Sequence, residues 1–510
     1  MPNYVAALDV GTTGTRTIIF DLEGKEVGRH YEEWASIYPS PVMVEQDANL
    51  WWTATRATID GALQKGNIDP KDIIGVACTN QRETIVPVDQ DGNPLSNAIV
   101  WQDRRSTAEC EIIKEEFGTD DIYQITGLTV DPYFSATKIL WIKNNQPEIY
   151  NKTYKFLLVH DFIVHKLTGR FVTDYTNASR TMLFNIEALK WSSNIAEAVD
   201  LDIDKMPEAV PPGTPIGEIT DQDATGFAPG TTVVAGAGDQ QAAALGVGVV
   251  EPGRIKCTTG TGSFILNHLE EPTFDPKRRV LCSCHADGKW VQEASIFTSG
   301  AVYRWVRDNF AAHECVLAEE NDRDPYDVMD EIARTSPVGS NGLILIPHFV
   351  GAGAPYWNPM ARGILFGLSL GHTRSDIYRA VMEGVAYEMR ANLEIFRELG
   401  SNPADLRVTG GGSRSDIWNQ IIADACHIPL KRGDFEESTA IGAAILAAYG
   451  TGQYQDVQAA ANSIAIMTKE WDPDSNHERK YDEMYELSRK LYALLDSADL
   501  YRELDGIRQE

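Results

Sequence analysis

The chain has 510 residues, 43% of them hydrophobic and 23% charged, with 45 lysines and arginines against 74 aspartates and glutamates. At roughly 150 residues per domain, this length predicts two to four domains. The formal net charge of −29 argues against a sequence-independent nucleic-acid binder, because such proteins need a basic face to displace counterions. The composition therefore predicts a multidomain globular protein in which any anionic ligand needs a local basic pocket.

The first residues lead almost directly into an apolar strand, without the basic and apolar segments of a secretory signal. No run approaches the ~20 apolar residues of a membrane span. The cysteines, 7 in number, are scattered along the chain, which is typical of reduced, packed thiols. The string CSCH at 282–285 has the ligand types of a metal cluster, but it lacks a second ligand pair, which favours strand residues. We expect a cytoplasmic protein with no nucleic-acid partner and no membrane insertion.

Apolar runs alternate with amphipathic segments from one end of the chain to the other. The runs predict strands at 4–10, 16–22, 73–80, 231–238, 253–260, 262–267, 342–348 and 406–412. The amphipathic segments predict helices at 49–65, 375–399 and 415–426, and a polar-faced surface helix at 476–500. This alternation predicts an α/β fold.

The segment at 5–24 is similar to the segment at 254–270, because each has a strand, a Gly/Thr-rich turn and a second strand. Solenoid repeats recur every 20–50 residues, whereas this similarity recurs about 250 residues later. Duplication of a whole domain explains it more simply. We therefore expect two similar domains, 1–248 and 249–510, with their turns facing each other across a cleft and an irregular boundary near Gly246–Gly253.

The two turns, Gly11–Thr15 and Gly260–Gly262, fit neither the Walker phosphate loop nor the Rossmann fingerprint. The first leads into a β-branched segment, which predicts a β-hairpin instead of a helix start. Glycines in such a turn avoid Cβ clashes, so backbone N–H groups can point into one concavity and hold phosphate oxygens. Asp9 precedes the first turn, where its carboxylate could hold Mg²⁺ through water. One such turn is usually a plain tight hairpin, but two copies favour a phosphate site.

A third glycine cluster, Gly410–Gly412, follows a predicted strand and continues into Ser413-Arg414-Ser415 and a predicted helix. Glycines there could let a flat ring approach the backbone, with Arg414 or Ser415 contacting the ring or ribose. A strand-to-helix turn is the alternative. Together with two phosphate turns, this cluster predicts a nucleotide site.

Asp239 follows a predicted strand at the start of an apolar helix, and it directly precedes the second hairpin in sequence. Such an Asp is often only a helix cap, but a carboxylate beside a phosphate site could take the proton from an attacking hydroxyl. Arg82 and Glu83 lie at a strand end, where they could bind hydroxyl edges of a small polyol or form a local salt bridge. Trp101 and Phe264 could cover its CH face or pack in a core.

Two longer strings, YFSATKILWIKNN at 133–145 and GILFGLSLGHTRSDIYRAVMEGVAYE at 363–388, resemble the signatures of the FGGY family of carbohydrate kinases. The resemblance covers essentially the whole chain. It implies an α/β fold of two duplicated RNase H-like domains of the actin/Hsp70/sugar kinase type, flanking a cleft. It also implies an ATP-dependent carbohydrate or polyol kinase with a small-molecule substrate.

Within that family, TNQRET, NAIVWQDRR and TDYTNASRTMLFNI are most similar to glycerol kinases. This resemblance implies that glycerol is phosphorylated to glycerol 3-phosphate with ATP and Mg²⁺. Carried over residue by residue, it implies a polyol site of Arg82, Glu83, Trp101, Tyr133, Asp239, Gln240 and Phe264, with Asp239 as general base. It implies nucleotide contacts from Thr12, Thr13, Arg16, Thr261, Gly300, Arg304, Gly411 and Ser415, although glycerol kinases often have Gln at position 304 and Asn at position 415.

The C-terminal string GGGSRSDIWNQIIADA is more similar to xylulokinases, gluconokinases and autoinducer-2 kinases. A kinase for xylulose, another pentulose or an autoinducer-2-like polyol is therefore an alternative, although the NQRET string counts against a pentulose. A nucleotide-gated binding protein without kinase activity is a further alternative, against which the presence of Asp239 argues. The loop that binds fructose 1,6-bisphosphate in some glycerol kinases is replaced by 217–231, so we do not expect that regulation. A homodimer or homotetramer is compatible with the resemblance.

Overall fold

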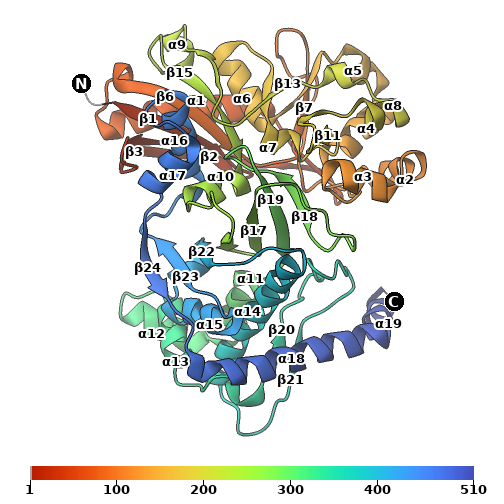
Figure 1. Ribbon diagram of the computed structural model, residues 1–510, viewed down its shortest axis with the longest axis vertical. Helices are drawn as coiled ribbons and strands as arrows, with labels where there is room; N and C mark the ends of the chain where they lie inside the picture. The colour runs from red at the N-terminus through yellow and green to blue at the C-terminus, as the bar shows by residue number, and fades with distance from the viewer. Residues whose placement is uncertain (1–2, 510) are drawn as a thin grey trace. The chain divides into compact units, whose positions relative to one another are not determined.

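The computed structural model describes residues 3–509, and the side chains of residues 3–507 (Figure 1). The chain forms two compact units. Unit 1 contains the residues up to Val250 together with His268–Val291 and Glu437–Ile466, and unit 2 contains Glu251–Asn267, Gln292–Glu436 and Met467 onwards. Residues 247–253, where the sequence predicts the domain boundary, contain no helix or strand. Two later segments of the chain nevertheless belong to unit 1.

Unit 1 is built on a six-stranded sheet of order β14-β15-β6-β1-β2-β3. Its strands are β14 (Pro215–Glu218), β15 (Thr232–Gly238), β6 (Ile73–Asn80), β1 (Tyr4–Val10), β2 (Gly14–Asp21) and β3 (Glu26–Glu33). The β1–β2 and β2–β3 pairs are antiparallel, β1 and β15 run parallel to β6, and β14 closes the edge antiparallel to β15. The predicted hairpin around Gly11–Thr15 is therefore the β1–β2 connection.

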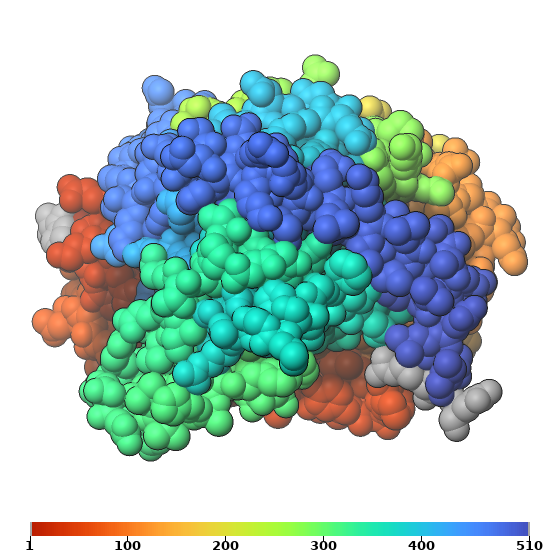
Figure 2. Space-filling view, turned by 90° about the horizontal axis from the view of Figure 1, so that it is seen from below, coloured from red at the N-terminus to blue at the C-terminus, as the bar shows by residue number. Residues whose placement is uncertain are grey.

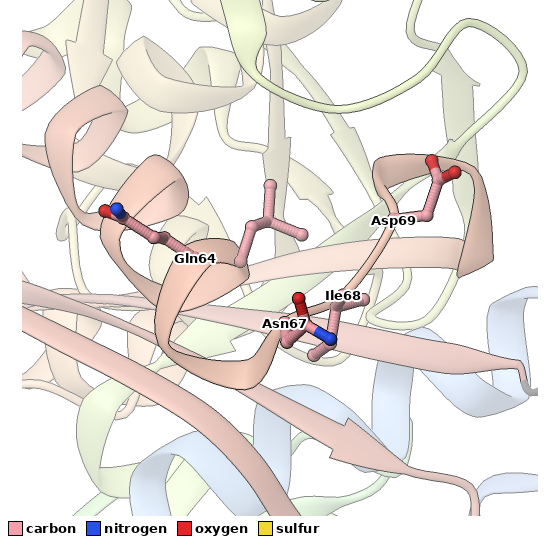
Figure 3. A pocket seen from close by; sticks show the side chains of 5 residues that line it. Gln64, Asn67, Ile68 and Asp69 are labelled. Atoms are coloured by element: carbon pink, nitrogen blue, oxygen red, sulfur yellow. The ribbon is translucent and has the colours of Figure 1, made fainter.

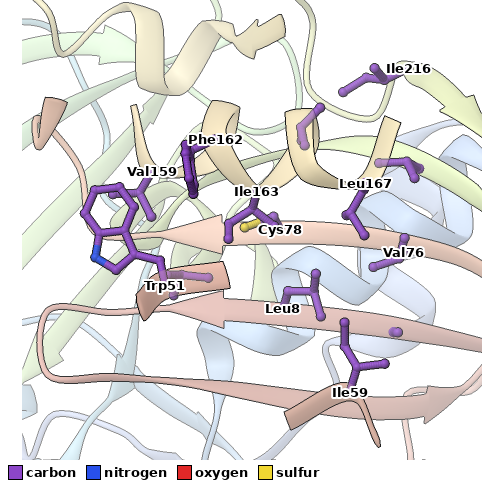
Figure 4. Packing of buried hydrophobic residues seen from close by; sticks show 14 of the residues in the cluster. Leu8, Trp51, Ile59, Val76, Cys78, Val159, Phe162, Ile163, Leu167 and Ile216 are labelled. Atoms are coloured by element: carbon purple, nitrogen blue, oxygen red, sulfur yellow. The ribbon is translucent and has the colours of Figure 1, made fainter. Parts of the chain in front are cut away.

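One face of this sheet packs against α1 (Ala48–Gly66) and α6 (Val159–Thr168) in a buried core (Figure 4). Trp51 of α1 and Phe162 of α6 meet edge to face, with ring centroids 5.9 Å apart. Helix α16 (Ser438–Gly450) contacts β1, β6 and β15, and it also packs on α10 (Asp239–Gly246). The buried sheet thus holds the ends of β1, β6 and β15 in a fixed arrangement.

A five-stranded sheet of order β4-β5-β8-β7-β9 and several short elements complete unit 1. The strands are β4 (Ile37–Ser40), β5 (Met43–Gln46), β7 (Ile85–Val88), β8 (Ala98–Ile99), β9 (Lys155–Leu158), β10 (Val172–Asp174), β11 (Phe184–Asn185), β12 (Lys190–Trp191), β13 (Glu208–Val210) and β18 (Leu281–Cys284). The helices are α2 (Thr107–Glu116), α3 (Thr119–Thr126), α4 (Ser135–Asn145), α5 (Pro147–Lys152), α7 (Tyr175–Ala178), α8 (Ser193–Ala198), α9 (Gln222–Thr225), α17 (Val457–Ile464), and the 3₁₀ turns η1 (Pro70–Asp72) and η2 (Ile203–Lys205).

In unit 2 the strands follow the order β19-β17-β16-β22-β23-β24. They are β16 (Arg254–Thr259), β17 (Ser263–Leu269), β19 (Trp290–Ile296), β22 (Asp405–Thr409), β23 (Leu430–Gly433) and β24 (Met467–Trp471), and β20 (Ile344–Ile346) pairs separately with β21 (Ile364–Phe366). The helices are α11 (Gly300–Phe310), α12 (Ala312–Glu320), α13 (Pro325–Ala333), α14 (Arg374–Glu398), α15 (Asp416–Cys426), α18 (Ser475–Ser497), α19 (Leu500–Gln509), and the turns η3 (Ser340–Gly342) and η4 (Gly411–Arg414).

The two sheets have the same plan. In unit 2, β16 pairs antiparallel with β17 and parallel with β22, which runs parallel to β23, while β24 lies antiparallel at the edge. The order and directions of β17, β16, β22, β23 and β24 thus match those of β2, β1, β6, β15 and β14 in unit 1. The predicted α/β fold of two similar halves is confirmed, and so are the predicted strands and the three predicted helices, within a few residues at their ends.

The predicted polar-faced helix at 476–500 corresponds to α18, which packs on α14, α15 and β20. In Figure 2 the darkest blue segments, the last of the chain, lie on the surface beside other segments of unit 2. Within residues 3–509, no helix is both long and apolar enough to cross a bilayer.

The cysteines are free thiols, and all but Cys315 are buried. Cys282 and Cys284 lie in β18, as the strand interpretation predicts. Burial raises the pKa of Cys282 to about 12, and His285 contacts the carbonyl oxygen of Val249 at 2.7 Å. Burial thus disfavours the thiolate form of Cys282.

Candidate active site

The first Gly/Thr turn is held firmly from its own unit. The Gly11 N–H donates to the Gly14 carbonyl at 2.9 Å, and a Cβ on Gly14 would lie 2.4 Å from the carbonyl oxygen of Glu32. The Thr12 carbonyl accepts from Trp34 Nε1 at 3.0 Å and Gln46 Nε2 at 2.7 Å. Among the described residues, no hydrogen bond uses the backbone N–H of Thr12 or Thr13. The turn therefore offers adjacent donors on a fixed backbone, which fits a phosphate group.

Asp9 lies in β1 directly opposite Arg16 of β2. Burial raises the pKa of Asp9 to about 7; the Arg16 cation opposes this rise, whereas the nearby carboxylates of Glu437 and Asp239 add to it. The Arg16 guanidinium is 3.6 Å from Asp9 and also pairs with Glu437. Asp9 and Glu437 thus share the Arg16 cation, with the Asp239 carboxylate nearby. Such oxygen-rich acidic surroundings suit a hard divalent cation. Arg16, expected to contact nucleotide, is engaged by carboxylates of unit 1.

Arg82, Glu83 and Asp239 form a charged cluster where β6 and β15 end. Arg82 Nε lies 3.3 Å from Asp239 Oδ1 and 3.8 Å from Glu83 Oε1. The Arg82 side chain is 2% exposed, whereas that of Asp239 is 35% exposed. The buried guanidinium therefore orients a carboxylate that remains accessible to a small molecule.

Glu83 sits in the left-handed region, with a φ of +62°. Its carboxylate accepts from Arg180 Nε at 2.6 Å, and both side chains are 1% exposed. The Arg180 guanidinium also lies 5.9 Å from the centre of the Tyr133 ring. A strained backbone held by two buried arginines indicates a carboxylate fixed in one orientation.

Trp101 and Tyr133 lie beside this cluster, and Trp101 also reaches the first Gly/Thr turn. Their rings meet edge to face, with centroids 5.6 Å apart. Trp101 Nε1 donates to Thr12 Oγ1 at 3.0 Å. The buried Lys138 ammonium donates to the Tyr133 carbonyl at 2.6 Å and the Pro132 carbonyl at 2.8 Å, which fixes the loop that carries Tyr133.

Asp239 is the first residue of α10, as the sequence predicts. Its Oδ1 accepts from the N–H of the next residue, Gln240, at 2.7 Å. The same oxygen is the one paired with Arg82. Unit 1 therefore brings together Arg82, Glu83, Trp101, Tyr133 and Asp239, with Gln240 adjacent and Thr12 one hydrogen bond away.

In unit 2, the turn at Gly260–Gly262 is also closed by a backbone hydrogen bond from its first glycine, over a shorter span than in the first turn. The Gly260 N–H donates to the Gly262 carbonyl at 2.9 Å, and the Gly300 N–H donates to the Gly260 carbonyl at 2.9 Å. A Cβ on Gly300 would lie 2.3 Å from that carbonyl oxygen. Thr261, at the tip, is exposed and accepts from Ser299 and Ala301 through its carbonyl. Thr261 and Gly300 therefore lie together.

The glycine cluster after β22 has one position without a packing reason for glycine. Gly410 has a φ of +86°, which favours glycine, and a Cβ on Gly412 would lie 2.5 Å from the Thr259 side chain. At Gly411, however, a Cβ would meet no described atom within 4 Å. Open space beside a bare backbone fits a flat ligand ring.

Ser415, Arg304 and Phe264 are the remaining residues of unit 2 that the sequence predicts to contact ligands. Ser415 Oγ accepts from Trp418 N at 3.1 Å, so it caps α15. Arg304 is exposed on α11, and Phe264 is half-buried in β17. The structure thus gives Ser415 a structural role that the sequence did not predict.

Sequence reasoning missed Arg180 and Glu437. Arg180 lies in the string TDYTNASRTMLFNI, which had a family resemblance but no distinct chemical pattern. Glu437 lies more than 400 residues after its partner Arg16, and only the packing of α16 in unit 1 brings it near.

A shallow pocket where α1 ends is lined by Leu63, Gln64, Asn67, Ile68 and Asp69 (Figure 3). It contains none of the residues described above. Asn67 there is the left-handed cap of α1, and Asp69 caps η1. These side chains are occupied in ending one element and starting the next.

Two units of equal strand order, each with a Gly/Thr hairpin, have the architecture expected of the actin/Hsp70/sugar kinase fold. Residues 4–246 match the N-terminal domain of the FGGY family of carbohydrate kinases, and residues 255–451 match its C-terminal domain. The chain belongs to the FGGY family of carbohydrate kinases. It is an ATP-dependent carbohydrate or polyol kinase.

Similar proteins include a glycerol kinase from Caldanaerobacter subterraneus subsp. tengcongensis, 38% identical over 504 residues that cover 96% of this chain and 97% of that protein. Glycerol kinase 2 of Thermotoga maritima is 36% identical over 489 residues, covering 94% and 96%. Among solved structures, a ligand-bound xylulose kinase from Lactobacillus acidophilus has a TM-score of 0.89 at 26% identity, covering 98% of this chain and 100% of that one. Plasmodium falciparum glycerol kinase with ADP has a TM-score of 0.87 at 25% identity, covering 96% and 98%.

Proposed function

We propose that the protein transfers a phosphoryl group from ATP to a terminal hydroxyl of glycerol, which gives glycerol 3-phosphate. The observation that carries this proposal is the Arg82–Asp239 pair, in which a buried guanidinium holds an accessible carboxylate at 3.3 Å. A small polyol needs such a mixture of acceptor and donor groups at its hydroxyls.

In this proposal Asp239 accepts the proton of the attacking hydroxyl. The Arg82 guanidinium orients that carboxylate and donates to a substrate hydroxyl, while Glu83 accepts from a hydroxyl. Trp101 and Tyr133 flank the CH face, with Gln240 adjacent, and Phe264 is a further candidate for contact with the polyol. Phosphoryl transfer needs mainly positioning and charge stabilisation, which these fixed side chains and the glycine turns provide.

Nucleotide contacts are proposed for Thr12, Thr13, Thr261, Gly300 and Gly411, with Arg16, Arg304 and Ser415 as further candidates. The unused N–H groups of Thr12 and Thr13 and the open backbone at Gly411 support the first group. Asp9 is proposed to hold Mg²⁺ through water, a role that the carboxylates of Glu437 and Asp239 near it favour. The ion would neutralise charge on the phosphates when bound.

The choice of glycerol is supported by the similar proteins that are named glycerol kinases, at 36–38% identity over most of the chain. The structural similarity to a xylulose kinase at 26% identity supports the alternative, a kinase for a pentulose or another polyol. A cytoplasmic location and a homodimer or homotetramer stay predictions from the sequence.

A panel of acceptors tests the proposal. ADP release is measured with ATP, Mg²⁺ and either glycerol, xylulose, ribulose, gluconate or erythritol at equal concentrations. We expect glycerol to give the highest kcat/KM. Turnover with a pentulose and none above background with glycerol would contradict the proposal and favour the alternative.

Asp9→Asn gives a prediction for stability against pH. Burial raises the pKa of Asp9 from 3.8 to about 7, so between these pH values the folded protein holds a proton that the unfolded chain has lost. The free energy of unfolding contributed by Asp9 therefore falls as pH rises from about 4 to about 7, and the loss persists above 7. Without nucleotide and Mg²⁺, we expect Asp9→Asn to melt higher than the wild type at pH 8 but not at pH 4.

Thermal melts of both proteins across this range measure the effect. The exposed Asp91→Asn, in the loop after β7, serves as a control that should follow the wild type at every pH. Parallel curves for Asp9→Asn and the wild type would show that the buried Asp9 carboxyl is not destabilising.

A further inference from the structure

The pairing of β15 with β6 is interrupted a few residues before Asp239. The register shifts between Val234 and Ala237, and pairing resumes with Ala237 opposite Thr79 and Gly238 opposite Asn80. Two N–H groups in this stretch are accepted by side chains. Gly236 N donates to His160 Nε2 at 3.1 Å, and Gly238 N donates to Thr176 Oγ1 at 2.8 Å. The backbone leading to Asp239 is therefore set by side chains from other elements.

Thr176 is held in one orientation by Asp174. The Thr176 hydroxyl donates to Asp174 Oδ1, which leaves its oxygen free to accept from the Gly238 N–H. The same Asp174 carboxylate accepts from the backbone N–H of Thr176 at 2.8 Å and of Asn177 at 3.2 Å, and so caps α7. Asp174, Thr176 and Asn177 are completely buried. Asp174 thus fixes the Thr176 hydroxyl, which accepts from the N–H of Gly238, the residue before Asp239.

Asn177, the next residue of α7, connects this helix to the end of β6. Asn177 and Asn80 exchange two amide hydrogen bonds, each 3.0 Å long. Asn80 is the last residue of β6, and its amide also donates to the Gln81 carbonyl at 2.6 Å, immediately before Arg82. Asn177 therefore holds the strand end that presents Arg82 and Glu83.

We propose that the Asp174–Thr176–Asn177 segment is a positioning element that sets the Asp239 carboxylate against the Arg82–Glu83 pair. This inference rests on the proposed function, since it assigns those three side chains to the acceptor site. Thr176 and Asn177 differ in what they position. Thr176 acts through Gly238 on Asp239, the proposed base, whereas Asn177 acts through Asn80 on the polyol-binding pair.

Substitutions at Thr176 and at Asn177 are therefore expected to change different kinetic constants. Thr176→Val keeps the shape of the side chain but removes the acceptor, and a misplaced reacting group can cost about 10²-fold in rate. We expect kcat to fall about 10²-fold while the acceptor KM changes less than about threefold. Asn177→Leu is expected to raise the acceptor KM about tenfold, with a smaller effect on kcat. Thr176→Ser keeps the hydroxyl and is expected to restore kcat.

The experiment measures kcat, acceptor KM, ADP affinity and melting temperature for the full-length variants. Thr153→Val is the matched control, because Thr153 is equally buried and its hydroxyl bonds to the Ile149 carbonyl at 2.7 Å, at the end of α5. It should lower the melting temperature without changing the kinetics. If Thr176→Val does not fold, Thr176→Cys, with a weak acceptor of similar size, is expected to show the same kcat loss to a smaller degree.

Wild-type kcat in Thr176→Val would overturn the inference. The inference would also be overturned if kcat and ADP affinity fell and KM rose in proportion to the drop in melting temperature, without rescue by Thr176→Ser. That result would indicate a general packing role. The acceptor is the best substrate of the wild type, whichever it is, and Asp239→Asn is assayed in parallel. Activity in Asp239→Asn would contradict the proposed function; an inactive Asp239→Asn beside a fully active Thr176→Val would contradict only this inference.

Discussion

Asp239→Asn is expected to lower kcat by about 10²–10⁴-fold, the range that removal of a general base gives. The amide preserves the shape of the side chain and still accepts from Arg82, but it cannot take the proton of an attacking hydroxyl. ADP affinity should stay near that of the wild type, because the proposed nucleotide contacts do not include Asp239. Steady-state ADP release and calorimetric titration with ADP measure the two quantities.

The control for this variant is Asp223→Asn, which removes an acid from the first turn of α9. It should leave kcat unchanged. A kcat for Asp239→Asn within about threefold of the wild type would remove Asp239 as the base, since acid–base catalysis contributes at least about 10².

Glu83→Gln is expected to destabilise the protein and raise the acceptor KM together. Glu83 lies between the buried guanidiniums of Arg82 and Arg180. Loss of its charge leaves these cations with less compensation, and breaking a buried pair in this way costs about 3–5 kcal/mol. We expect a clear drop in melting temperature and an acceptor KM raised at least about tenfold, because one of the two carboxylate oxygens that could accept from a hydroxyl becomes an NH₂ donor.

Glu111→Gln is the matched control for a surface pair, since Glu111 forms an exposed ion pair with Lys114. Exposed pairs contribute about 0–1 kcal/mol, so its melting temperature and KM should match those of the wild type. A Glu83→Gln protein as stable as this control would show that the buried cations do not depend on the Glu83 charge.

Local sequence signals predicted the parts of the fold that depend on neighbouring residues. Alternating apolar runs with β-branched residues marked β1, β2 and β6, and the glycines at the turn between β1 and β2 marked the hairpin. The similarity between the two hairpins predicted two similar domains, and their common strand order is what a duplicated domain would keep.

The sequence could not predict contacts that depend on distant packing. Helix α16 follows unit 2 in the chain but packs on β1, β6 and α10 of unit 1, and it brings Glu437 to Arg16. No local pattern indicates which sheet a buried helix covers. The same holds for Arg180 and Asn177, whose partners Glu83 and Asn80 each lie 97 positions earlier.

For the site residues too, the sequence predicted positions in the chain but not the contacts made there. Asp239 was marked by its place between a strand and an apolar helix, and the structure adds Arg82 at 3.3 Å. Ser415 is predicted as a nucleotide contact, and in the structure its hydroxyl oxygen accepts from Trp418 N and caps α15. A cap and a ligand contact look the same in sequence, because both use a small polar residue where a helix begins.

A competition between acceptors tests the central claim most directly. The wild-type protein receives glycerol and D-xylulose at equal concentrations with limiting ATP and Mg²⁺, and mass spectrometry identifies the phosphorylated products. The proposed function predicts that glycerol 3-phosphate takes most of the phosphate. A product that is mainly a pentulose phosphate would contradict it.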